Sequence, residues 1–138
     1  MERIYVVAKS EERKKCQEMG RAQLLLDAEI NRLSELQSYR QTYEERASSE
    51  SGIHPAHWAD YQNFLHRLSD AVTEQEKHVL TGRENRDLHR KNWMAKRKRL
   101  DSLQRVVDRY RQIEDLEMEQ KLQKSLDDRP HTKNVFTS

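Results

Sequence analysis

The chain has 138 residues, of which 36% are charged and only 34% are hydrophobic, and its mean hydropathy is −1.16. The 26 basic and 24 acidic residues nearly cancel to a net charge of +2, so the chain lacks the charge excess that is typical of disordered proteins. Three glycines and two prolines provide few turns, which excludes a sheet protein or a loop-rich enzyme and predicts long helices. The single cysteine, Cys16, allows no internal disulfide or thiolate zinc cluster, and we expect a reducing, intracellular setting.

The first nine residues contain an apolar run of only a few positions. A signal peptide needs a longer apolar core, and a membrane span needs roughly 20 residues. We therefore expect the protein to reach a membrane only through its partners.

Helix-breaking residues divide the chain. Turn-type residues cluster only at 48–55 inside the chain, and the other proline is Pro130. The uninterrupted stretches at about 3–48 and about 56–128 are predicted to be helices, joined by a turn at about 49–55. Pro55 fits the first turn of the second helix, where its missing N–H costs nothing. Residues 131–138 lack periodicity and are predicted to be a disordered tail.

Both stretches repeat a packing residue every three or four positions, which is typical of a helix seam. In the first stretch these residues are Met19, Ala22, Leu26, Ile30, Leu33, Leu36 and Tyr39 or Tyr43. In the second, a heptad passes through Tyr61, Leu65, Leu68, Val72, Gln75, Val79, Gly82, Arg86, His89, Trp93, Lys96, Leu100, Leu103, Val107 and Tyr110. Because the linker is short, we predict an all-α coiled-coil hairpin of two long antiparallel helices.

The register of this hairpin follows from the position of the turn. Facing residue numbers should sum to about 105, which places Tyr43 near Tyr61 and Leu26 near Val79. The other expected pairs are Leu36 with Leu68, Leu33 with Val72 and Tyr5 with Leu100. The first helix should be about 70 Å long and the second about 110 Å, so residues beyond about 105 should have no partner within the chain.

No pattern of catalytic or metal-binding residues is present in the sequence. The six histidines lie outside known metal-ligand spacings: His54, His57, His66, His78, His89 and His131. A two-helix rod has no concave pocket that excludes water, and the chain has no Gly-rich phosphate loop. We therefore expect no enzyme activity, no metal and no cofactor.

Residues 83–99 form the clearest charge cluster, with eight basic residues against Glu84 and Asp87. The basic residues are Arg83, Arg86, Arg90, Lys91, Lys96, Arg97, Lys98 and Arg99. Three interpretations remain open: a solvated face or pairing with acidic residues of the first helix, a surface for an acidic protein, and a nucleic-acid surface around Trp93. Membrane-surface binding is disfavoured, because the segment lacks a wide apolar face.

Residues 58–72 carry apolar side chains on two adjoining stripes. One stripe is Tyr61, Leu65, Leu68 and Val72; the other is Phe64, Leu68, Ala71 and Gln75. Neighbouring positions point about 100° apart, so one partner helix covers only one stripe well. Either Phe64 lies under the chain reversal, or its stripe is exposed and available to another protein.

Three sequence elements resemble the flagellar export protein family FliJ. The first is the run at 36–43, LQSYRQTY, with Tyr39 and Tyr43. The second is WADYQNFL, a W-x-x-Y-Q-x-F element with Trp58, Tyr61 and Gln62. The third is a tryptophan followed by a basic cluster and leucine, beginning at Trp93. The resemblance covers about residues 20–125.

The resemblance implies an antiparallel coiled coil similar to the gamma, or stalk, subunit of rotary ATPases. Such a protein stands in the centre of the hexameric export ATPase, contacts the membrane-embedded export gate and handles export chaperones. Because acidic residues of the first helix lie opposite the basic segment and the overall charge is nearly balanced, we expect no nucleic-acid partner. The resemblance also implies a cytoplasmic protein that is peripherally associated with the inner membrane at the flagellar base. Gate binding then falls to Phe64, Leu68, Ala71 and Gln75, which favours an exposed Phe64. The alternatives are a stalk protein of a virulence type III secretion system and a nucleic-acid-binding coiled coil.

Overall fold

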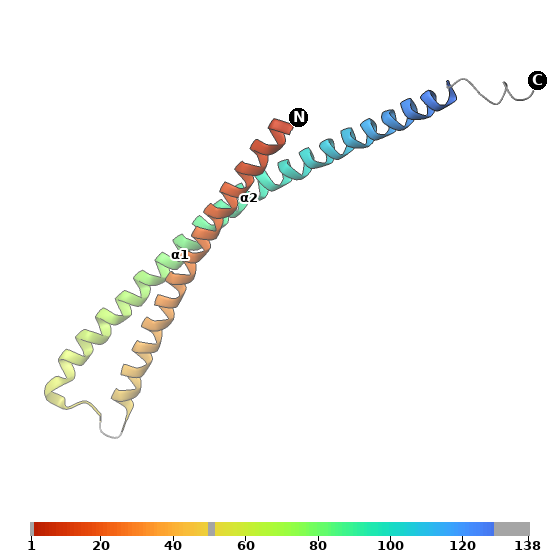
Figure 1. The fold of residues 1–138 in the computed structure, drawn as a ribbon. Coiled ribbons are helices and arrows are strands. Elements are labelled where there is room, and N and C mark those ends of the chain that lie inside the picture. Colours follow the sequence, from red (N-terminus) through yellow and green to blue (C-terminus); the bar gives the residue numbers. More distant parts are fainter. Residues whose placement is uncertain (1, 50–51, 129–138) are drawn as a thin grey trace, which may run out of the picture.

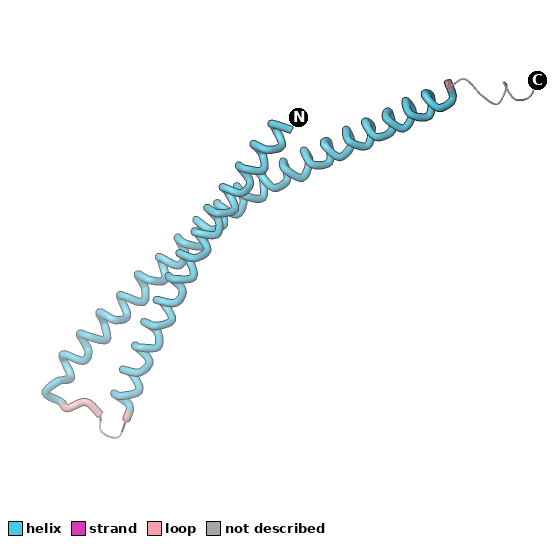
Figure 2. The backbone as a smooth tube through the Cα atoms, viewed as in Figure 1, coloured by secondary structure: helices cyan, strands magenta, loops and turns pink. Residues whose placement is uncertain are grey.

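The computed structural model describes residues 2–49 and 52–128, which form a long, unequal helical hairpin. Helix α1 spans Glu2–Ser48, the short 3-10 helix η1 spans Pro55–His57, and α2 spans Trp58–Asp127 (Figure 1). No strand occurs among the described residues (Figure 2). The predicted fold class, two long antiparallel helices with the second longer, is confirmed. The predicted tail at 131–138 lies outside the described residues.

The chain reversal is built from glycine, proline and histidine. Gly52 adopts a left-handed φ of 52°, which a side chain would disfavour, and its N–H donates to the Ser49 carbonyl at 2.9 Å. On the other side, the His54 Nδ1 accepts a hydrogen bond from the Ala56 N–H at 3.1 Å. Pro55 begins η1 without an unsatisfied N–H. Because these residues form a 3-10 turn, α2 begins at Trp58 rather than at about 56.

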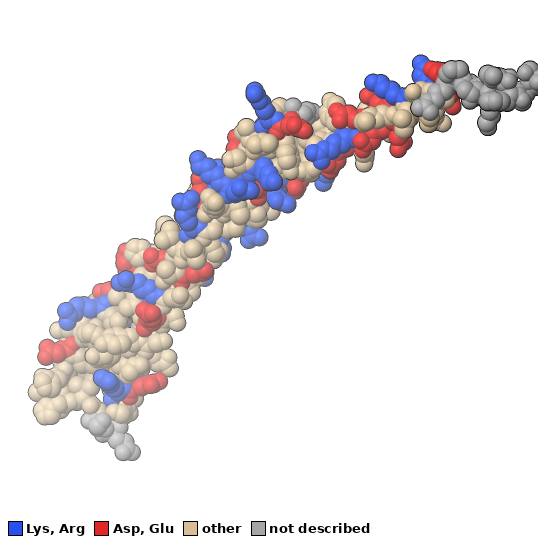
Figure 3. Space-filling view, viewed as in Figure 1, with Lys and Arg blue, Asp and Glu red and all other residues tan. Residues whose placement is uncertain are grey.

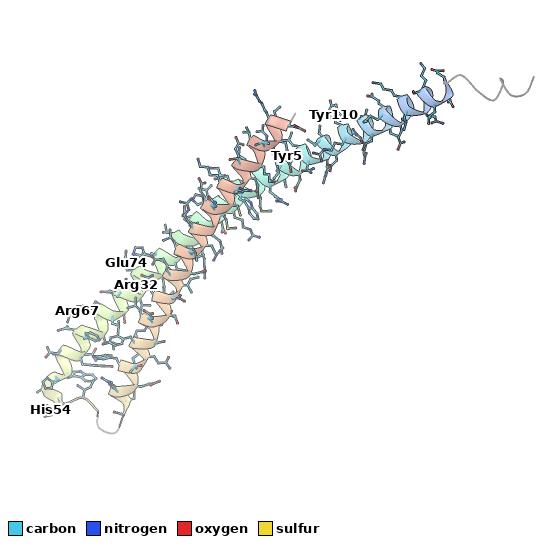
Figure 4. All side chains as sticks on the ribbon, in the orientation of Figure 1. Tyr5, Arg32, His54, Arg67, Glu74 and Tyr110 are labelled. Carbon is cyan, nitrogen blue, oxygen red and sulfur yellow. The ribbon has the colours of Figure 1, made fainter. Side chains whose placement is uncertain are left out.

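The two helices differ greatly in length. At 1.5 Å per residue, the 47 residues of α1 extend about 70 Å and the 70 residues of α2 about 105 Å. Figure 4 places His54 at the closed end of the hairpin and Tyr110 on α2 near the end of α1. Every described residue from 108 onward is exposed. The prediction that α2 runs on without a partner is therefore confirmed.

The hairpin buries a narrow line of side chains between the helices. The buried residues are Ala8, Ala22 and Leu26 on α1 and Leu68, Val72, Gln75, Val79, Leu100 and Val107 on α2. None of the predicted seam positions of α2 from 61 to 107 is exposed, so that seam is confirmed. Tyr110, the last predicted position, is 53% exposed, because α1 does not extend that far.

The first helix departs from prediction at one position. Ile30 is 37% exposed, and Glu29 takes the place in the seam that was expected for Ile30. Glu29 accepts a hydrogen bond at its backbone carbonyl from the Gln75 Nε2 at 2.9 Å. A strict seven-residue repeat from Ala22 leads to Glu29, so the period of the coiled coil outweighs the greater hydrophobicity of isoleucine at this position.

Cross-helix hydrogen bonds fix the register. The Tyr61 hydroxyl donates to the Tyr43 carbonyl at 3.2 Å, near the closed end. Near the open end, the Trp93 Nε1 donates to the Glu12 carboxylate at 2.9 Å. The residue numbers of these pairs sum to 104 and 105, so the predicted register is confirmed.

Candidate partner-binding surfaces

Five aromatic side chains gather at the closed end of the hairpin and form what we call the aromatic cluster. Its members are Tyr39, Tyr43, Trp58, Tyr61 and Phe64. The ring centroids of Tyr43 and Phe64 are 4.6 Å apart, those of Tyr39 and Tyr43 are 5.2 Å apart, and those of Trp58 and Tyr61 are 5.7 Å apart. Aromatic pairs at these separations contribute about 0.5–1.5 kcal/mol beyond their buried area. The cluster therefore joins the ends of α1 and α2 across the turn.

Two members of the aromatic cluster remain open to solvent. Tyr39 and Trp58 are each 50% exposed, whereas Tyr43, Tyr61 and Phe64 are half-buried. A hydrogen bond with the neighbouring Tyr43 side chain raises the pKa of the Tyr39 hydroxyl above its ordinary value of 10.0. Large rings that are half exposed beside a packed cluster are suited to anchoring a partner.

The stripe of Phe64, Leu68, Ala71 and Gln75 is not a continuous exposed surface. Leu68 is 7% exposed and Gln75 is 4% exposed, and both lie in the seam with α1. The Gln75 amide also donates to the Glu29 carboxylate. Ala71 is exposed, and Phe64 is half-buried. The expectation of an exposed stripe is therefore wrong at Leu68 and Gln75, because seven-residue spacing from Tyr61 places both against α1.

Phe64 fits neither of the two alternatives that the sequence left open. Its ring packs against two tyrosines of α1, Tyr39 at 6.2 Å and Tyr43 at 4.6 Å between centroids, rather than under the turn. Of the other motif residues, Gln62 is exposed next to the cluster. Trp93 lies far along α2, where it bonds to Glu12 across the seam. The residues of the three sequence elements thus lie in two places, at the closed end and in the middle of the rod.

The basic residues at 83–99 divide between the seam and the surface. Three take part in polar contacts with described residues: Lys96 Nζ lies 3.2 Å from Glu11, Arg97 lies 3.7 Å from Glu12, and Arg86 pairs with Asp87 at 2.9 Å. The other five are exposed and form no ion pair within the described part of the chain: Arg83, Arg90, Lys91, Lys98 and Arg99. In Figure 3 basic side chains gather over the middle of the rod.

The seam is polar next to this basic segment. Arg86 donates to the Gln23 side-chain oxygen at 3.4 Å, and the His89 Nδ1 lies 4.0 Å from the Glu18 carboxylate. That His89 nitrogen is buried and has no hydrogen-bond partner among the described residues. A hydrogen bond of 3.2 Å from Lys15 lowers the pKa of Glu18 below its ordinary value of 4.5. Side-chain hydrogen bonds and charge pairs, rather than apolar packing, therefore join the helices here.

The described residues contain no group of three or more histidine, cysteine or acidic side chains that could hold a metal ion. No helix in the described part of the chain is both long and apolar enough to span a bilayer. The exposed features of the described residues are the half-exposed aromatic cluster, the basic residues at 83–99 and the end of α2 that has no partner helix.

These features define a rod-shaped coiled-coil protein. A family model described as the flagellar FliJ protein matches residues 1–131, and the chain belongs to the FliJ family, as its sequence elements predicted. It is therefore a coiled coil associated with flagellar type III export, in a family that serves as a structural component of the export apparatus. Neither the search of curated proteins nor the search of solved structures gave a match.

Proposed function

We propose that the chain is a stalk-like component of the flagellar export apparatus, which connects the hexameric export ATPase to the cytoplasmic part of the export gate. The observation that carries the proposal is the difference between the two ends of the rod. The open end continues as a single exposed helix from residue 108, and the closed end carries the half-exposed rings of Tyr39 and Trp58. A lone helix suits the centre of a ring, and exposed aromatic rings suit a protein surface.

The open end is the part that we assign to the ATPase ring. Beyond the end of α1, α2 exposes Ile113, Leu116 and Met118 by 45%, 57% and 70%. A ring of six subunits offers a central opening in which such a helix is covered from all sides. Removal of residues 111–138 should abolish binding to the ATPase hexamer while binding to the gate is retained.

The closed end is the part that we assign to the export gate. Within the expected gate-binding set, Phe64 and Ala71 are accessible to a partner, at least in part. Leu68 and Gln75 contribute indirectly, since they hold α2 against α1 and so keep Phe64 in place. The protein reaches the inner membrane at the flagellar base through this contact.

A substitution at Ala71 tests the gate surface better than a substitution in the seam does. Ala71→Glu adds a charged side chain at an exposed position of α2, whereas a change at Leu68 would also weaken the hairpin. Ala28→Glu, at an exposed position of α1, is the matched control because it makes the same substitution with the same cost in helix propensity. We expect Ala71→Glu to lose binding to the cytoplasmic domain of the gate in a pull-down, and Ala28→Glu to retain it. Equal binding by both variants would contradict the assignment.

The basic surface is the part that we assign to acidic patches on the export chaperones. Lys91 and Lys98 are exposed and form no ion pair with a described residue, so a partner could neutralise them. Binding through such exposed charges should weaken as the salt concentration rises. Chaperone binding that is unaffected by Lys98→Glu would contradict this part of the proposal.

A further inference from the structure

At the open end of the hairpin, both helices contribute exposed apolar side chains to one side of the rod. On α1 these are Ile4 and Val7, exposed by 51% and 56%. They line one groove between the helices, together with Arg3, Ala8 and Glu11 of α1 and Arg99 of α2. Positions seven residues apart lie on the same side of a helix in a coiled coil, so Val106 and Ile113 continue this side beyond Arg99. We call it the open-end surface.

The α2 part of the open-end surface carries no acidic residue. Its positions recur every seven residues from 99, 102 and 105, and all of them are exposed: Arg99, Ser102, Arg105, Val106, Arg109, Gln112, Ile113 and Leu116. The three arginines form no ion pair within the described part of the chain. The surface on α2 therefore consists of apolar side chains among unpaired positive charges.

The acidic residues nearby lie off this surface or already have a partner. Asp101 pairs with Arg97 at 3.5 Å. Asp108 borders the surface, but its carboxylate accepts a hydrogen bond from the Gln104 Nε2 at 2.9 Å. On α1, Glu11 lies in the groove and pairs with Lys96 at 3.2 Å. The two remaining acidic residues of the stretch 99–116, Glu114 and Asp115, are not among the surface positions. The net charge of the surface is therefore positive.

We infer that the open-end surface is where the chain contacts the export ATPase, and that it fits an apolar surface of the ring with acidic residues around it. The inference rests on the proposed assignment of the open end to the ATPase, and it adds the side and the chemistry of the contact. Exposed apolar groups and unpaired arginines are both stabilised by a partner that supplies apolar atoms at the centre and carboxylates at the rim.

The contact is one-sided because of where the apolar residues lie. The large exposed apolar side chains of α2 between 99 and 116 are Val106, Tyr110, Ile113 and Leu116, exposed by 36–57%. Three of them are on the open-end surface, and Tyr110 is at the neighbouring seam position. The contact also includes the first two turns of α1, since Ile4 and Val7 lie beside Arg99. A lone helix held by the ring would not involve α1.

The shape of the surface favours a protein over a lipid bilayer. An anionic bilayer would complement the same arginines. However, the α1 part of the surface is a groove between two helices, and a protruding side chain of a protein fills a groove better than a flat bilayer does.

Two neighbouring valines of α1 test the side of the contact. Val7 lines the groove, and the groove residues do not include Val6, which is 63% exposed. Each is replaced by glutamate in the full-length chain, and binding to the assembled ATPase hexamer is measured by biolayer interferometry. Val7→Glu should raise the dissociation constant about tenfold or more, and Val6→Glu should change it less than about twofold. The two variants have the same cost in helix propensity, and circular dichroism checks that helicity is unchanged.

Two arginines of α2 test the charge of the contact. Arg109 lies on the open-end surface, whereas Arg111 is about 200° farther around the helix and lines a different groove, with Glu2 and Tyr110. Arg109→Glu should weaken hexamer binding about tenfold or more at low salt, and the loss should shrink as salt rises. Arg111→Glu is the matched control and should bind like the wild type.

The outcomes separate this inference from the proposed function. If the wild-type chain does not bind the hexamer, the proposed function fails and the inference fails with it. If removal of residues 111–138 abolishes binding but Val6→Glu and Val7→Glu bind alike, the proposed function stands and the one-sided contact is overturned. If Val7→Glu and Arg109→Glu keep hexamer binding but lose binding to phosphatidylglycerol vesicles that the wild type shows, the surface binds lipid and the inference is overturned.

Discussion

Two helical glycines differ in what an added methyl group would meet, and this difference gives a sharp test of the seam. At Gly20 of α1, no neighbouring atom lies within 4 Å of the position that a Cβ would occupy. At Gly82 of α2, the Cβ would lie 3.3 Å from Leu26 Cδ1 and 3.7 Å from Leu26 Cα. Leu26 is 1% exposed. The absence of a side chain at Gly82 therefore lets the backbones of α1 and α2 approach closely.

The expected magnitudes follow from these surroundings. Alanine is favoured over glycine in a helix interior by about 1 kcal/mol, so Gly20→Ala should raise the melting temperature by about 4 °C for a chain of this size. Gly82→Ala gains the same stabilisation from helix propensity, but Leu26 must move by a few tenths of an ångström to make room for the new methyl group. Overpacking of this kind costs about 1–3 kcal/mol. We therefore expect Gly82→Ala to melt at or below the wild-type temperature.

Thermal unfolding followed by far-UV circular dichroism, at equal protein concentration, measures both changes. A double-mutant cycle with Leu26→Ala makes the cause explicit, because the smaller side chain removes the steric conflict. In that background Gly82→Ala should become stabilising by about the amount seen for Gly20→Ala. If Gly82→Ala alone stabilises as much as Gly20→Ala, then close packing at Leu26 does not limit this position, and the reasoning is refuted.

Three further predictions concern the seam, the acidic residues and the free helix end. Leu26→Ala should cost about 3 kcal/mol in urea unfolding, whereas Leu25→Ala, at a residue 65% exposed, should change stability by less than about 0.5 kcal/mol. The pKa of Glu18 is lower in the folded chain than its ordinary 4.5, because Lys15 bonds to its charged form. As the pH falls, Glu18 is therefore protonated in the unfolded chain before it is protonated in the folded chain. The stabilisation that the Lys15–Glu18 interaction provides above pH 4.5 is lost as the pH falls below this value. Between neutral and acid pH, the melting temperature of Glu18→Gln should thus decrease less than that of the wild type; equal decreases would contradict this. Removal of residues 111–138 should leave the melting temperature of the hairpin almost unchanged in dilute solution, because every described residue there is exposed; a large decrease would contradict the unpaired state of this segment.

The seam of α2 could be predicted from sequence even where its residues are polar. Arg86, His89 and Lys96 are poor core residues, but the seven-residue repeat that passes through Val79 and Leu100 includes them. The structure places all three at least partly under α1. The repeat is a property of two helices that wind around each other, so it constrains position more strongly than the chemistry of any one side chain does.

The repeat was less useful where hydrophobicity competed with it. On α1, hydrophobicity favours Ile30 over Glu29, although only Glu29 lies seven residues from Ala22. On α2, the spacing of Leu68 and Gln75 fits both an exposed stripe and the seam, and the repeat from Tyr61 decides for the seam. In both cases the strict heptad is the better guide to burial.

The position of Phe64 could not be predicted from spacing alone. Its burial depends on two tyrosine rings of α1 that turn toward it, with centroids 4.6 Å and 6.2 Å away. A helical repeat predicts which residues face a partner helix, but it does not predict how large side chains at its edge are oriented. The extent of the aromatic cluster therefore required the structure.

The composition of the seam also makes its segments unequal in strength. Toward the closed end, buried leucine and valine side chains contribute about 1.5–3 kcal/mol each. Farther along the rod, partly exposed pairs such as Lys96 with Glu11 contribute about 0–1 kcal/mol each. Beyond these pairs, Ala8, Leu100 and Val107 are buried, so apolar packing again holds the first turns of α1 against α2. Because α2 is one continuous helix, a partner that displaces α1 at the open end must overcome this apolar contact but leaves the closed end, with the surface that we assign to the gate, intact.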